Sequence, residues 1–154
     1  MLWNTKIKVK NVKMNNKFEW KKDFETGNEQ LDNEHRQLFK QINKLYKMFS
    51  DTKKYHAQIP EMIKLLEFTM IEHFEIENEL LKNHSIFAGE EHIQEHNRIK
   101  ESIYEIKNYN LPTIITALML CDIIINYFLK HFQDFDKKFI SELNEKLEIE
   151  SKIH

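Results

Sequence analysis

The sequence predicts an all-α fold, a bundle of four helices preceded by an N-terminal arm. The first observation is composition, because the chain holds only 2 Gly and 2 Pro, which leaves little turn chemistry for a sheet protein. The second is that valine, a strand-favouring residue, occurs only at Val9 and Val12. The third is the spacing of apolar residues in steps of three and four, which is typical of helices that bury one face.

Each predicted helix has its own apolar seam. The first seam runs from Leu31 to Phe49 and the second from Ile59 to Leu80. The third begins with histidines and continues through isoleucines to Ile106, and the last opens after Pro112 and extends to Phe139. The connections between seams are short, so consecutive helices are expected to pack as antiparallel neighbours.

The bulk composition describes one soluble domain. A chain of 154 residues with 41% hydrophobic and 31% charged residues is long enough to bury a core. The formal net charge of −2 predicts no nucleic-acid partner. The most apolar segment, 114–129, contains Asp122 and Asn126 and is shorter than the ~20 residues of a membrane span, so we expect none. The single Cys121 and the lack of a secretory signal favour a cytoplasmic location.

The chain divides into three parts by composition. Residues 1–17 carry five lysines, some of which alternate with apolar residues. This pattern is compatible with either a short edge-like strand or a solvated tail. We interpret this segment as a loosely held extension. Residues 18–145 are expected to form the helical domain, and residues 146–154 a charged amphipathic tail.

The strongest motif lies between His73 and His96, in HFEIENELLKNHSIFAGEEHIQEH. His73 and Glu77 are four residues apart, as are His92 and His96, so each pair shares one face of a helix with Cβ atoms about 6 Å apart. Glu77 falls where the core should be, and no Lys or Arg stands at the seam positions of its helix. Because an unpaired buried carboxylate is costly, a metal ion explains it better.

Other helices contribute candidate ligands at the same level. His35 lies in the first seam, where taken alone it is better explained as a hydrogen-bonded core histidine. His131 and Asp136 are five residues apart, about 140° round a regular helix, so they serve one site only between helices or in a locally widened helix. Seven mixed nitrogen and oxygen ligands are too many for one zinc, calcium or magnesium ion and suit two octahedral iron ions bridged by carboxylates.

Three histidines are not expected to bind the metals. His84 lies seven residues beyond Glu77, about 10 Å further along the helix axis. His56 and His154 have no ligand spacing and are interpreted as surface residues.

The order and spacing of these residues resemble the hemerythrin family, specifically the stand-alone bacterial hemerythrins. The match covers roughly Trp20 to Phe139. It is carried by Trp20, Thr26, Gly27, Asp32 and His35 in the first part, then by HFEIENELL, HIQEH and HFQDFD around the other ligand positions.

The resemblance implies an up-down-up-down bundle and two non-haem iron ions, bridged by carboxylates and by an oxo or hydroxo group. It implies that they bind dioxygen reversibly for carriage, storage or delivery. It implies one iron held by three histidines, a second iron with an open position held by two, and two bridging carboxylates. The implied residues are His92, His96 and His131 for the first iron, His35 and His73 for the second, Glu77 and Asp136 as bridges, and Leu38, Phe74, Phe128 and Phe132 as the pocket lining.

Tyr127 and Phe128 depart from the family, which commonly has Trp-Leu at these positions. We expect Phe128 to narrow the pocket and the Tyr127 hydroxyl to bring a proton donor near the bound oxygen.

The competing functions are a di-iron enzyme that reduces peroxide, nitric oxide or oxygen, and an oxygen or iron sensor. The sequence has no flavin, Fe–S or rubredoxin-like module to supply electrons and no signalling domain, which favours a binding protein over an enzyme. We expect a monomer, and the electron donor is unknown.

Overall fold

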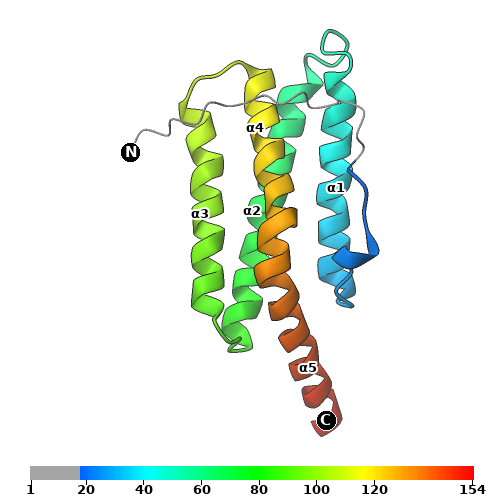
Figure 1. Cartoon of the computed structure of the whole chain (residues 1–154), viewed down its shortest axis with the longest axis vertical. Helices are drawn as coiled ribbons and strands as arrows, with labels where there is room; N and C mark the ends of the chain where they lie inside the picture. The colour runs from blue at the N-terminus through cyan, green and yellow to red at the C-terminus, as the bar shows by residue number, and fades with distance from the viewer. Residues whose placement is uncertain (1–17) are drawn as a thin grey trace.

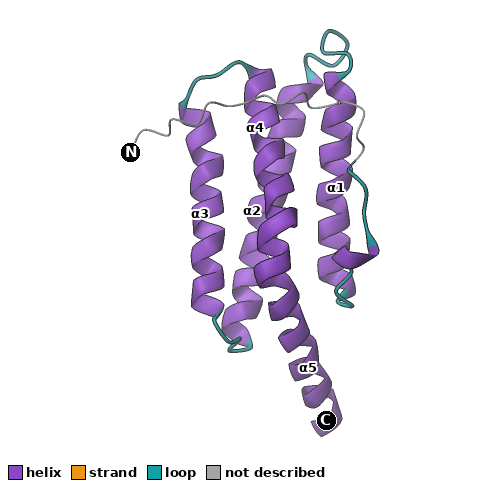
Figure 2. Cartoon of the chain, viewed as in Figure 1, coloured by secondary structure: helices purple, strands orange, loops and turns teal. Residues whose placement is uncertain are grey.

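The computed structural model describes residues 18–154, and every regular element in this range is helical (Figure 2). The prediction for the extension 1–17 lies outside the described residues. A short 3-10 helix, η1, precedes four main helices, and the fourth continues through a π-helical stretch, η2, into a fifth segment. The elements are η1 (Lys22–Phe24), α1 (Glu29–Phe49), α2 (Gln58–Asn83), α3 (Gly89–Asn108), α4 (Thr113–Asn126), η2 (Tyr127–Asp136) and α5 (Lys137–Ile153).

The four long helices pack side by side and alternate in direction (Figure 1). Helices α1 and α3 run one way, and α2 and α4 run the other, so the predicted up-down-up-down bundle is confirmed. The segment α5 continues the last helix past the end of the bundle (Figure 1). The predicted boundary at residue 146 therefore falls inside a helix that extends to Ile153.

The continuous helix Thr113–Ile153 is long and apolar enough to cross a membrane by length and composition, with a mean hydropathy of 1.6 in its most apolar window. One such helix is weak evidence of a span, because the core helix of a soluble bundle passes the same test.

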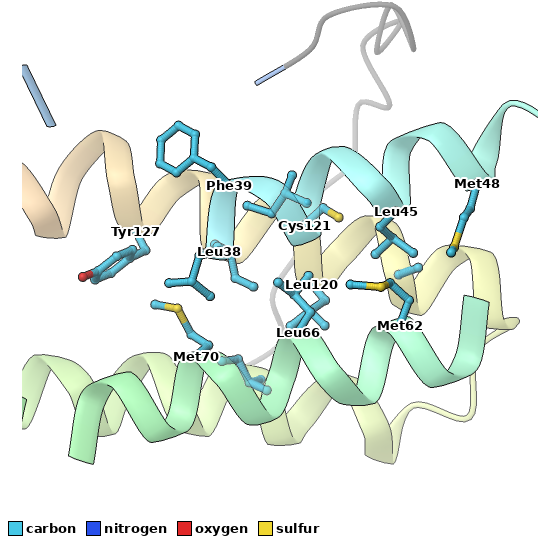
Figure 3. Packing of buried hydrophobic residues seen from close by; sticks show 14 of the residues in the cluster. Leu38, Phe39, Leu45, Met48, Met62, Leu66, Met70, Leu120, Cys121 and Tyr127 are labelled. Carbon is cyan, nitrogen blue, oxygen red and sulfur yellow. The ribbon is translucent and has the colours of Figure 1, made fainter. Parts of the chain in front are cut away.

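The buried core consists of two apolar clusters with a layer of polar side chains between them. The larger cluster fills most of the bundle and includes Leu38, Leu66, Met70 and Cys121 (Figure 3). The smaller cluster lies toward the α2–α3 connection and α5. Three helices pass through the layers in turn: Leu31, His35 and Leu38 on α1; Phe74, Glu77 and Leu81 on α2; Phe132, Asp136 and Phe139 on the last helix. Apolar side chains therefore flank the polar layer on both sides.

The segment before α1 packs against the bundle. Trp20 lies edge-on to Phe39, with ring centroids 5.1 Å apart, and the guanidinium of Arg36 lies 5.0 Å from the Trp20 ring centroid. Gly27 has φ +80°, a left-handed conformation that favours glycine. The aromatic side chain of Trp20, in the segment before the first helix, thus packs against the buried core.

Asp32 fastens this segment to α1 one turn before His35. Its buried carboxylate accepts hydrogen bonds from the Thr26 backbone N–H (3.0 Å), the Thr26 hydroxyl (2.7 Å) and the Gly27 N–H (3.2 Å). The Asn28 side chain accepts from the Leu31 N–H and caps the helix. These bonds fix where α1 begins and hence where His35 lies.

We expect Asp32→Ala to lower the free energy of unfolding by about 2 kcal/mol, because it leaves three partly buried donors without their acceptor. Chemical denaturation measures the change. Asp51→Ala is the matched control, since exposed Asp51 accepts a single backbone bond from Lys54 and its loss should cost under about 1 kcal/mol. Equal losses in the two variants would contradict the anchoring role of Asp32.

Candidate metal centre

The four helices bring all seven predicted ligand residues into the polar layer. Each of the seven residues is at most 5% exposed. They come from α1, from the C-terminal half of α2, from the first two turns of α3 and from η2. The residues are His35, His73, Glu77, His92, His96, His131 and Asp136.

The last helix is locally widened at His131 and Asp136, whose five-residue spacing led us to expect it. Residues Tyr127–Asp136 form a π-helix, whose i→i+5 hydrogen bonds add almost one residue to each turn. His131 and Asp136 are five residues apart and therefore point to the same side. The His131 Nε2 atom lies 3.0 Å from Asp136 Oδ1.

The donor atoms form two groups, each with its atoms within 4.8 Å of one another. In one group, His35 Nε2 lies 3.1 Å from His73 Nε2. In the other, His92 Nε2 lies 3.1 Å from His131 Nε2, and His96 joins them. Neighbouring ligands of an octahedral ion with bonds of about 2.1 Å lie about 3 Å apart, so both spacings suit a shared metal ion.

Two carboxylates belong to both groups. Glu77 Oε1 lies 3.3 Å from His73 Nε2, whereas Glu77 Oε2 lies 3.1 Å from His96 Nε2. Asp136 Oδ1 lies 2.8 Å from His92 Nε2, and its Oδ2 accepts a short hydrogen bond from the Tyr127 hydroxyl on the side of His35. Each carboxylate thus offers one oxygen to each group of histidines.

The chemistry of the donors fits a pair of metal ions. Both oxygens of Glu77 are buried, and within residues 18–154 neither has a partner in hydrogen-bond geometry, although nitrogens of His73 and His96 lie 3.3 Å and 3.1 Å away. His96 Nε2 is likewise buried without a hydrogen-bond partner in this range, whereas nearly all buried polar atoms in proteins have one. Five imidazoles and two carboxylates are donors that suit iron and other transition metals. Two metal ions, one in each group, would give the Glu77 oxygens and His96 Nε2 the partners that they lack.

A comparison with curated proteins found a similar protein. The chain is 26% identical over 128 residues to a protein named Bacteriohemerythrin from Clostridium acetobutylicum, an alignment that spans 80% of this chain and 98% of the relative. The comparison supports a place in the hemerythrin family. No family model and no solved structure matches the chain.

The charges of this hemerythrin-like centre are set by burial and by contacts among its members. Burial and the charge of Asp136 oppose ionisation of Glu77, but His73 and His96 outweigh them and lower the pKa of Glu77 to about 2. Burial opposes the charge on His73, but Glu77 and Glu34 outweigh it and raise the pKa of His73 to about 10. Burial, with the charge on His73, lowers the pKa of His35 to about 4.

At neutral pH, therefore, the Glu77 carboxylate is ionised and His35 is neutral, which are the states that bind metal. Asp136 is ionised too: burial disfavours its charge, but His131 and His92 hold its pKa well below the usual value. His73, by contrast, carries a proton that metal binding must displace.

The sequence analysis missed two residues that orient the histidines. Glu34 Oε2 accepts a hydrogen bond from His73 Nδ1 at 2.8 Å, and Asn78 Oδ1 accepts one from His96 Nδ1 at 2.7 Å. Both bonds leave Nε2 directed at the centre, an arrangement common around metal-bound histidines. Each partner lies on a different helix from its histidine, so no local spacing reveals the pair. The only sequence signal is that each directly adjoins a ligand position.

Of the predicted pocket residues, four are fully buried around the centre. Phe74 stacks on His96 with ring centroids 4.3 Å apart, and Phe132 lies edge-on to His35 at 5.1 Å. Leu38 and Tyr127 belong to the same apolar cluster (Figure 3). The side chain of Phe128 lies outside the described residues, so its expected effect on the pocket stays a prediction.

The remaining histidines lie away from the centre. His84 follows the end of α2, belongs to neither donor group, and has Nδ1 3.9 Å from Glu150 Oε1. His56 and His154 are exposed, as expected.

We expect Glu77→Ala to lose bound metal with little loss of helix content, because the variant removes one of the two carboxylates that belong to both groups. Elemental analysis and circular dichroism measure the two properties. His84→Ala is the control and should keep the full metal content. Metal loss in the control would contradict the exclusion of His84.

The metal-free protein should be most stable near pH 6.5. The folded pKa of His35, about 4, lies below its usual 6.5, so stability declines as the pH falls from about 6.5 to 4. The folded pKa of Glu77, about 2, lies below its usual 4.5, so stability declines further as the pH falls below 4.5. A folded pKa of His73 above its usual 6.5 means that its contribution declines as the pH rises toward about 10. Denaturation midpoints measured from acid to alkaline pH test both the acid and the alkaline decline.

The alkaline decline should be weaker in His73→Gln and unchanged in His84→Gln. A decline of equal size in His73→Gln would show that another group causes it.

Proposed function

We propose that this protein binds dioxygen reversibly at a non-haem di-iron centre, in carriage, storage or delivery. The observation that carries the proposal is the unequal division of donors. Three histidines and two carboxylates form one group, whereas two histidines and the same two carboxylates form the other. With six positions per ion, a bridging oxo or hydroxo group would complete the five donors of the first group. The four donors of the second group and the same bridge would leave one position for an exogenous ligand.

When bound, two ferrous ions supply the two electrons that dioxygen takes up on binding and returns on release. The protein holds the ions and orients their ligands. Glu77 and Asp136 connect the two groups, and Glu34 and Asn78 keep His73 and His96 turned toward the centre.

Reversible binding requires that water, protons and reductants stay away from the bound oxygen. The two apolar clusters meet this requirement from both ends of the polar layer. Phe74 and Phe132 are fully buried against the histidines, and Leu38 and Met70 extend the apolar wall. The relative from Clostridium carries a hemerythrin name, which supports iron as the metal.

One observation favours the competing function, an enzyme that reduces peroxide, nitric oxide or oxygen. The Tyr127 hydroxyl lies inside the centre and is a potential proton donor. Such turnover also needs electrons from a partner of unknown identity. We therefore propose a binding protein rather than an enzyme, and we expect a cytoplasmic monomer.

Optical absorption separates the two functions. We expect protein with two irons per chain to develop the absorption bands of oxidised iron in air, to lose them under vacuum and to recover them over several cycles. The Glu77→Ala variant is the control and should show no cycle. One-way oxidation with rapid consumption of peroxide or nitric oxide would support the enzyme, and purified protein that holds only zinc would contradict both.

A further inference from the structure

The Tyr127 hydroxyl lies among the donor atoms of the centre rather than at their edge. Its oxygen is 3.0 Å from His73 Nε2 and 3.3 Å from His35 Nε2. It also donates a short hydrogen bond to Asp136 Oδ2. The side chain is 2% exposed and comes from the first residue of η2, four residues before His131. The hydroxyl therefore faces the group with fewer donors.

The surroundings of Tyr127 fix the position of its oxygen. The phenol ring stacks on His131 with ring centroids 5.2 Å apart and packs against Phe74 at 5.6 Å. A tyrosine side chain has few rotatable bonds, and this one is held between a stacked and an edge-on ring contact. The hydroxyl is thus positioned before any ligand arrives, which avoids an ordering cost on binding.

The Tyr127 hydroxyl acts as a hydrogen-bond donor in this structure, because it donates to Asp136 Oδ2. An O–H group rotates freely to suit its acceptor. Once Asp136 Oδ2 binds a metal ion it becomes a weaker acceptor, and the proton can turn to another acceptor within reach.

We propose that Tyr127 determines ligand specificity at this centre: its hydroxyl donates a hydrogen bond to the exogenous ligand at the metal ion held by His35 and His73. The proposal rests on the proposed di-iron centre. A hydrogen bond to a charged acceptor is stronger than one to a neutral acceptor. Tyr127 therefore favours small anionic ligands over neutral ones in an otherwise apolar pocket.

Azide, a small anion, is the probe for this hydrogen bond. In iron-loaded, oxidised protein we expect Tyr127→Phe to weaken azide binding about tenfold to a hundredfold, the range for a hydrogen bond to a charged group. Spectrophotometric titration gives the Kd, and iron analysis shows whether both ions are retained. Unchanged azide affinity with both irons retained would overturn the proposal.

Tyr46→Phe is the matched control. Tyr46 is half-buried on α1, eleven residues after His35 and so about 16 Å further along the helix. The same loss of a phenol hydroxyl there should leave azide affinity unchanged. An equal loss in the control would show that the effect in Tyr127→Phe is general and would overturn the proposal.

A measurement on the unmodified protein covers the case in which Tyr127→Phe fails to retain iron. A hydrogen bond from Tyr127 should shift the antisymmetric stretch of bound azide when the solvent is changed from H2O to D2O. No shift would overturn the proposal. A visible phenolate-to-iron band in the unmodified protein would also overturn it, because Tyr127 would then be a ligand and not a donor.

These results are separate from those that test oxygen binding. Failure to cycle in air and vacuum counts against the proposed function, even where azide binding depends on Tyr127. A chain that holds two irons, cycles with oxygen and binds azide equally well without the hydroxyl counts against the specificity role alone.

Discussion

The structure depends on two carboxylates, Glu77 and Asp136, that are buried in the middle of an apolar bundle. An isolated carboxylate there would be protonated or would destabilise the fold, because its hydration shell is lost. Here both remain ionised, since imidazoles from three helices surround them. The carboxylates and imidazoles together account for why the polar layer exists and why it lies at one depth in all four helices.

The need to bring both His131 and Asp136 into the polar layer determines the shape of the last helix. A regular helix directs residues five apart to different sides, yet His131 and Asp136 both have to reach the centre. The π-helical stretch Tyr127–Asp136 resolves the conflict by widening the turn. It also places Tyr127 against the same donors, so one local change in backbone geometry positions a histidine, a carboxylate and a phenol.

The apolar clusters and Tyr127 act in opposite directions on a bound ligand. Phe74, Phe132 and Leu38 exclude water and so remove proton sources from the centre. Tyr127 places one proton source inside it, held against His131 and Phe74. The balance between a dry pocket and a phenol oxygen held in one place distinguishes this centre from one lined only by apolar residues.

The sequence by itself determined the fold class and the seven candidate ligands, because helical periodicity and four-residue spacing are local properties. It identified His73, Glu77, His92 and His96 directly, and it stated that His131 and Asp136 require a widened helix. Only the tertiary structure decided which oxygen of each carboxylate faces which histidines. It alone revealed Glu34 and Asn78, since each binds a histidine on another helix and helix-to-helix register is not encoded in local spacing. It also placed the Tyr127 hydroxyl at the His35–His73 group, because the direction of a side chain in a π-helix follows from packing against the other three helices.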